Sequence, residues 1–103
     1  MIPITIERQG KDTLIRFSSD LDAGTVPECR SLIDTTLDDT DTSFIVDISK
    51  VIFIDSHGVG LFVSLLKKAH NRNGRLTFRG AQEQPLSVLK MVGFNNDLVE
   101  YIG

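Results

Sequence analysis

The sequence predicts a single α/β domain built on a mixed, mostly parallel β-sheet with helices packed on it. Segments with the apolar pattern of strands alternate along the chain with segments of helical spacing, as in domains made of βαβ units. The first two strand-like segments follow each other directly, which adds an antiparallel hairpin to the sheet. A chain of 103 residues without a Gly/Ser-rich or Pro-rich linker suits one domain over residues 1–103.

The first half of the chain carries three strand patterns and one helical pattern. Isoleucine alternates with polar residues at the N-terminus, and the alternation returns after a glycine-containing turn, as in a β-hairpin. Thr25 is placed to cap the helix that follows, and Pro27 fits only in the first turn of that helix. The apolar run that begins at Phe44 indicates a strand buried on both faces. These elements are expected at 2–6, 13–17, 25–37 and 43–48.

The second half begins with a short apolar run that leads into a long helix. Apolar residues recur at intervals of three and four after Ser56, until Asn73 and Gly74 end the pattern. Pro85 is expected to open a short helix and Gly93 to close it. The elements expected here are the apolar run at 51–54, helices at 56–71 and 85–92, and strands at 75–79 and 98–102.

Composition argues against several classes of function. The net charge is -3 and the basic residues are scattered, whereas a nucleic-acid binder normally has a basic stripe. Cys29 is the only cysteine, and His57 and His70 lie far apart, so neither a disulfide nor a metal cluster is expected. The N-terminal residues lack the basic and apolar regions of a signal peptide, so none is expected, and no apolar run approaches the length that a membrane span requires. We therefore expect a cytoplasmic protein without a cofactor.

The segment at 53–61 joins an apolar run to a helix and carries the most informative residues. Ser56 stands where the helix N-cap is expected, and its hydroxyl can accept a backbone N–H from Gly58 or Val59. The same position suits a phosphate, because free N–H groups and the helix dipole stabilise an anion there. Gly58 and Gly60 favour access by a partner or close packing. Local physics alone leaves both interpretations of the serine open, a plain N-cap and an anion position.

An enzyme is not expected from these residues. The Gly-x-Gly pair lacks the third glycine of a dinucleotide fingerprint, and the serine lacks a Walker lysine. Asp55, Ser56 and His57 are sequence neighbours at a helix start, so their side chains point in different directions and do not form a catalytic triad. His70 lies about four helical turns away.

The hexapeptide Asp55-Ser56-His57-Gly58-Val59-Gly60 resembles the signature of the STAS domain, specifically that of bacterial anti-sigma factor antagonists. The resemblance extends in order along nearly the whole chain. Its further matches are the acidic loop with Asp20 and Asp22 before the first helix, the strand at 44–49 and the helix and turn at 89–94. The resemblance implies a single STAS domain.

The resemblance also implies a function. In this family the first serine of the motif is phosphorylated by a GHKL-type serine kinase, often itself an anti-sigma factor, and a PP2C-like phosphatase restores it. The unphosphorylated chain is then expected to bind the kinase, and phosphorylation at Ser56 to release it. His57 departs from the serine or threonine usual at its position. The residues implied in partner binding are Asp20, Asp22, Asp55, His57, Gly58, Val59 and Gly60.

One alternative from a different functional class remains open at this point. Some free-standing STAS proteins are subunits of lipid-transport ABC systems, bound to the ATPase. The intact Asp55-Ser56 pair beside an acidic loop favours the regulatory role over the transport role.

Overall fold

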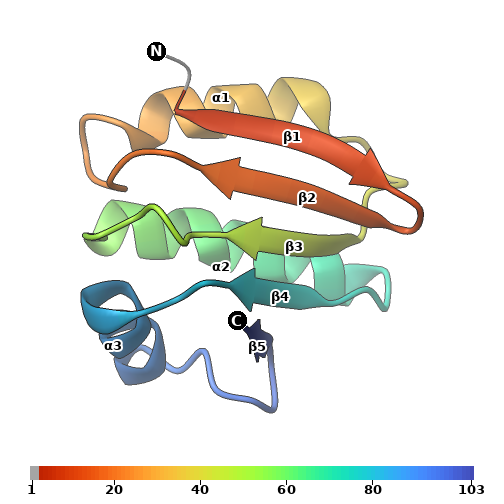
Figure 1. Cartoon of the computed structure of the whole chain (residues 1–103). Coiled ribbons are helices and arrows are strands. Elements are labelled where there is room, and N and C mark those ends of the chain that lie inside the picture. Colours follow the sequence, from red (N-terminus) through yellow and green to blue (C-terminus); the bar gives the residue numbers. More distant parts are fainter. Residues whose placement is uncertain (1–2) are drawn as a thin grey trace.

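In a computed structural model, which describes residues 3–103, the chain forms a five-stranded β-sheet and three α-helices (Figure 1). The element order predicted from the sequence is confirmed, and most boundaries agree within two residues. Ile2, placed at the start of the first predicted strand, lies outside the described residues. The elements are β1 (Ile4–Gln9), β2 (Asp12–Phe17), α1 (Val26–Thr36), β3 (Ser43–Asp47), α2 (Ser56–Asn71), β4 (Leu76–Arg79), α3 (Glu83–Met91) and β5 (Glu100–Ile102).

The strands lie in the order β1-β2-β3-β4-β5, which is also their order in the chain. β1 and β2 pair antiparallel, while each later pair is parallel, so the predicted mixed, mostly parallel sheet is confirmed. The parallel strands β2, β3 and β4 point the same way in Figure 1. The loops that follow them, at 18–25, 48–55 and 80–82, therefore meet at one end of the sheet. In open parallel sheets this end is where binding sites form.

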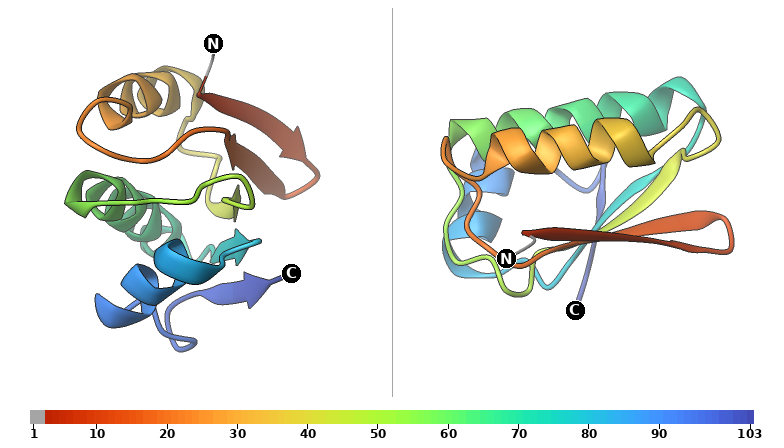
Figure 2. Two further views of the ribbon diagram at one scale, coloured as in Figure 1. Left: turned by 60° about the vertical axis from the view of Figure 1, so that its left-hand side comes forward. Right: turned by 90° about the horizontal axis from the view of Figure 1, so that it is seen from above.

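All three helices lie on one side of the sheet (Figure 2). The prediction that the strand at 43–48 is buried on both faces is wrong for this reason. Phe44 and Val46 are buried on the helix side, whereas Ile45 and Asp47 alternate with them on the other face and are only half-buried. Among residues 3–103 no helix covers that second face. Ile45 and Asp47 are therefore partly exposed, although Leu14 and Thr77 on neighbouring strands of the same face are buried.

A row of aromatic rings forms the centre of the core between the sheet and the helices. Phe62 of α2 packs edge-to-face on Phe17 of β2 and on Phe78 of β4, with ring centroids 5.7 and 5.1 Å apart. Phe94 continues the row, with its ring centroid 5.7 Å from that of Phe78. These contacts join strands, α2 and the turn after α3 in one core, which fixes the start of α2 relative to the sheet.

Three details of the helix and strand starts differ from the sequence-based expectation. Thr25 is the N-cap residue of α1, but its hydroxyl makes no cap bond and donates instead to the Asp20 carbonyl, at 2.5 Å. α3 begins at Glu83, so Pro85 lies within the first turn and does not open the helix. The last strand begins at Glu100, two residues later than expected. Pro27 lies in the first turn of α1 as predicted.

Candidate functional site

Ser56 is the first residue of α2 and is exposed at the end of the sheet where the loops meet. The prediction that Ser56 is the N-cap is wrong by one residue, because Asp55 takes that position. The Asp55 backbone is extended, and its Oδ1 atom accepts a hydrogen bond from the His57 amide at 2.7 Å. Within residues 3–103 the Ser56 hydroxyl has no hydrogen-bond partner. The plain N-cap interpretation of Ser56 is thereby excluded.

The carboxylate of Asp55 places a negative charge beside the serine. Desolvation raises the pKa of Asp55, but the amide groups of His57 and Gly58 outweigh this effect, and the resulting pKa lies below its ordinary value. Asp55 is therefore ionised at neutral pH. The Nδ1 atom of His57 lies 3.3 Å from the same carboxylate oxygen, so the unusual His57 contacts the cap residue.

Backbone hydrogen bonds attach the segment before Ser56 to the loop before α1. Leu21 and Ile54 form a parallel bridge. The Leu21 amide donates to the Phe53 carbonyl, and the Asp55 amide donates to the Leu21 carbonyl, both at 3.0 Å. Leu21 is fully buried and was not predicted as a site residue, although its apolar side chain between two aspartates was a signal for it.

The acidic loop lies beside the site as the sequence indicated, but its carboxylates have local structural contacts. Asp22 Oδ1 accepts the amides of Gly24 and Thr25, at 2.8 and 3.2 Å. Asp20 Oδ1 accepts the amide of Ile52 at 3.3 Å. The structure thus brings Asp20 to the segment that leads to Ser56. The partner-binding role of both acids stays a prediction.

The two glycines of the first turns of α2 differ in what surrounds them. Gly58 is buried, and a Cβ atom there would lie 2.9 Å from the Cβ and 3.1 Å from the carbonyl oxygen of Leu21. Gly60 has no such neighbour within 4 Å. Close packing therefore explains Gly58, while Gly60 leaves open space on the helix surface. Val59, the third neighbour in the motif, is half-buried and packs against the core.

The two glycines provide a matched test of this packing. We expect Gly58→Ala to lower the free energy of unfolding by about 1–2 kcal/mol, because Leu21 must shift to admit the methyl group. We expect Gly60→Ala to raise it by up to about 1 kcal/mol, because alanine has the higher helix propensity and the space is open. Urea unfolding of both variants measures the two changes. Equal effects of the two substitutions would contradict the assigned role of Gly58.

Two large apolar side chains are exposed directly before the site. Ile52 is 73% exposed and Phe53 is 44% exposed. Neither was predicted as a site residue, because both lie in an apolar run that has the sequence pattern of a buried strand. In the structure only Val51 and Ile54 of that run are buried. Exposed apolar residues beside polar groups are typical of protein interaction sites. We call the solvent-accessible residues of 52–57 the Ser56 surface: Ile52, Phe53, Asp55, Ser56 and His57.

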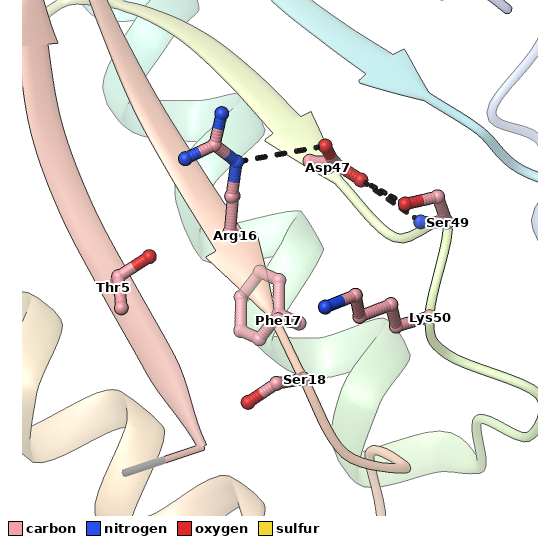
Figure 3. Close-up of a pocket in the computed structure, with 7 residues that line it drawn as sticks. All are labelled: Thr5, Arg16, Phe17, Ser18, Asp47, Ser49 and Lys50. Carbon is pink, nitrogen blue, oxygen red and sulfur yellow. Dashed lines mark hydrogen bonds and ion pairs between the residues drawn. The ribbon is translucent and has the colours of Figure 1, made fainter.

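A hollow of about 390 Å³ lies near the ends of β2 and β3 (Figure 3). None of the residues of the Ser56 surface lines it. Inside it Asp47 accepts hydrogen bonds from the amide and hydroxyl of Ser49 and lies 3.8 Å from Arg16. Desolvation raises the pKa of Asp47, but the bonds from Ser49 and the two nearby arginines bring it below its ordinary value. The residues that line it are Thr5, Arg16, Phe17, Ser18, Asp47, Ser49 and Lys50.

Neither a metal-binding cluster nor a membrane-spanning helix is present in the described part of the chain. No group of three or more His, Cys, Asp or Glu side chains within residues 3–103 is arranged to hold a metal ion. None of the helices described there is long and apolar enough to cross a membrane.

The fold and the site together define a small α/β domain that displays a serine at the start of a helix, held by a glycine-containing junction. The STAS domain family model matches residues 3–101, so the chain belongs to the STAS domain family. Over 88 residues it is 26% identical to the anti-sigma-B factor antagonist of Staphylococcus aureus strain NCTC 8325, a match that covers 85% of this chain and 82% of the relative. The resemblance stated from the sequence is thus confirmed.

Solved structures share the fold. The anti-sigma factor antagonist SpoIIAA in its unphosphorylated form matches with a TM-score of 0.73 at 22% identity, over 97% of this chain and 86% of SpoIIAA. The phosphorylated form of SpoIIAA, a Bacillus cell fate determinant, matches with a TM-score of 0.74 at 22% identity, over 95% of this chain and 89% of the other. At this identity the likeness shows the fold alone.

Proposed function

We propose that this chain is a regulatory binding protein of the anti-sigma factor antagonist type, controlled by phosphorylation of Ser56. The unphosphorylated form binds a GHKL-type serine kinase that acts as an anti-sigma factor, and phosphorylation releases the chain. A PP2C-like phosphatase restores the serine. All three proteins act in the cytoplasm, and the chain itself has no catalytic role in the cycle.

The observation that carries the proposal is that Asp55, and not Ser56, is the N-cap of α2. Asp55 caps α2, so the serine hydroxyl is exposed and has no hydrogen-bond partner in residues 3–103. A phosphoacceptor needs both properties, because the kinase must reach the oxygen and no internal bond should have to break. A serine whose oxygen capped the helix would first have to give up that hydrogen bond, worth about 1 kcal/mol, to present the oxygen to a kinase.

The Ser56 surface supports binding of a protein partner. Ile52 and Phe53 supply apolar area, and Asp55 supplies a negative charge next to the serine. The surface contains no lysine or arginine. A complementary partner presents an apolar pocket with basic groups at its rim, because opposite charges improve the rate and specificity of association.

Phosphorylated protein from the native cell is the direct test. We expect phosphopeptide mass spectrometry of the isolated chain to find phosphate on Ser56, and the purified unphosphorylated chain to retain a GHKL-type kinase. That kinase with ATP should label the wild-type chain and leave Ser56→Ala unlabelled. Labelling of the Ala variant at full rate, or self-labelling of the chain with ATP alone, contradicts the proposal. Retention of a transporter ATPase in place of the kinase supports the lipid-transport alternative.

A further inference from the structure

The side-chain amide of Gln84 makes two hydrogen bonds with the backbone of Ile54. The Ile54 amide donates to Gln84 Oε1 at 2.9 Å, and Gln84 Nε2 donates to the Ile54 carbonyl at 2.9 Å. Both polar groups of the Ile54 backbone are thus bonded to one side chain. Only an amide side chain offers a donor and an acceptor in this arrangement at neutral pH. Gln84 therefore pairs with Ile54 as a neighbouring strand would.

The Gln84 side chain satisfies the backbone groups of the segment before Ser56 that Leu21 does not reach. Leu21 bonds to the Phe53 carbonyl and the Asp55 amide on one side, and Gln84 bonds to the Ile54 amide and carbonyl between them. Every backbone polar group from the Phe53 carbonyl to the Asp55 amide is therefore held. Asp55, whose backbone follows directly, is the residue that caps α2. The contacts that set its position come from the loop before α1 and from α3.

The backbone of α3 is strained at the residue before Gln84. Glu83 has φ of 51°, in the left-handed region that residues with a side chain seldom adopt. Strain of this kind costs about 1–3 kcal/mol and persists where surrounding contacts determine the conformation. The two hydrogen bonds of Gln84 are such contacts. The strained residue and the paired amide are thus neighbours in the first turn of α3.

We propose that Gln84 is a positioning residue for the phosphorylation of Ser56. Gln84 fixes Ile54, Ile54 fixes the Asp55 cap, and the cap determines where the first turn of α2 presents the serine hydroxyl. Gln84 also ties α3 to the site, so displacement of α3 moves the segment before Ser56. The inference rests on the proposed function, because it assigns Gln84 a part in that phosphorylation.

Amide hydrogen exchange on the intact chain tests the positioning directly. We expect Gln84→Met, of similar length but unable to pair with a backbone, to lower protection about tenfold at the amides of Ile54, Asp55 and His57. Gln82→Met is the matched control, because Gln82 lies two positions away and makes no side-chain cap bond. Unchanged protection at Asp55 and His57 in the Gln84 variant overturns the inference.

The Gln84→Glu variant separates hydrogen bonding from packing. At pH 7 its carboxylate accepts the Ile54 amide but repels the Ile54 carbonyl, whereas the protonated acid can donate and accept as glutamine does. Protection at Ile54 and Asp55, relative to intrinsic exchange, should therefore rise as the pH falls below about 4.3. Asp20, Asp55 and Glu83 are the other acidic groups near this pair, and the wild-type chain measured over the same pH values accounts for them. A pH dependence identical to that of the wild type overturns the inference.

The kinase assay distinguishes the two proposals. We expect the partner kinase to phosphorylate Gln84→Met about tenfold more slowly than the wild type, and the Gln82→Met control at the wild-type rate. Equal rates for Gln84→Met and wild type overturn the positioning role while the proposed function stands. A wild-type chain that no kinase phosphorylates overturns the proposed function, and the exchange measurements then decide whether Gln84 holds the segment.

Discussion

Phosphorylation of Ser56 is expected to lower the affinity of the chain for its partner kinase about a thousandfold. Phosphate adds about 1.5 to 2 negative charges and three acceptor oxygens to a hydroxyl that lies open on the Ser56 surface. A partner that packs on the neutral hydroxyl, with its basic groups at the rim of the interface, must then bury this charge beside the carboxylate of Asp55 with no counter-charge at the phosphate itself. The cost is several kcal/mol, and about 4 kcal/mol corresponds to a thousandfold in the dissociation constant.

Titration calorimetry with the purified kinase measures this difference. The chain phosphorylated at Ser56 is compared with the unphosphorylated chain, and Ser56→Asp with Ser56→Ala. We expect the Ala variant to bind as the wild type does and the Asp variant to bind at least about tenfold more weakly, since it carries one charge of the same sign. Equal affinity of the Ala and Asp variants contradicts a switch at this residue.

A matched control places the same charge elsewhere on α2. Ser64 is exposed on the same helix, where its hydroxyl donates to the Gly60 carbonyl. Ser64→Asp adds one negative charge about 12 Å along the helix from Ser56 and should leave the affinity nearly unchanged if the effect is local. The fold should also persist in the phosphorylated chain, because the N-terminus of a helix stabilises an anion by up to about 1 kcal/mol when exposed. We therefore expect release without unfolding.

Asp41→Ala is expected to lower the free energy of unfolding by about 3 kcal/mol. Asp41 is 5% exposed, and its carboxylate accepts hydrogen bonds from Arg8 Nε at 2.9 Å and Nη2 at 2.6 Å. It also accepts the hydroxyl of Thr13 at 2.9 Å and the amide of Asp38 at 3.0 Å. Removing one partner of a buried ion pair costs about 3–5 kcal/mol. We expect the lower end of this range, because the Arg8 side chain is half-exposed and its guanidinium can be hydrated once the carboxylate is removed.

The same carboxylate predicts a dependence of stability on pH. The hydrogen bonds from Arg8, stronger than the opposing desolvation, lower the pKa of Asp41 from 3.8 to about 2. A carboxyl with a lowered pKa contributes stability that is complete above its unfolded value and is lost as the pH falls through its folded value. The free energy of unfolding should therefore fall less steeply between about pH 4 and pH 2 in Asp41→Ala than in the wild type.

Asp39→Ala is the control for both measurements. Asp39 is two positions away, and its carboxylate is 85% exposed and 3.6 Å from Arg72. An exposed ion pair contributes about 0–1 kcal/mol, so denaturant unfolding should separate the two variants by about 2 kcal/mol or more. Similar losses for Asp39→Ala and Asp41→Ala contradict the assigned role of the buried carboxylate.

Several parts of the fold and the site could be predicted because their signals are local. The hairpin, the helix from Ser56 to Asn71 and the order of the elements follow from the spacing of apolar residues, which needs no knowledge of the rest of the chain. The burial of individual side chains could not be predicted where it depends on packing against residues distant in the chain. Val51 and Ile54 are buried while Ile52 and Phe53 are exposed, and nothing in that apolar run distinguishes the two pairs.

The sequence by itself determined the α/β class, the resemblance to the STAS domain and the place of the serine at the start of a helix, because the motif and the apolar periodicity lie in short stretches of chain. Only the tertiary structure decided that Asp55, and not Ser56, caps the helix and that Gly58 is needed for packing against Leu21. It also decided that Gln84, 30 positions from Ile54, holds the segment before the serine. These are contacts between residues distant in the chain, and they depend on how the loops after β2, β3 and β4 meet at one end of the sheet.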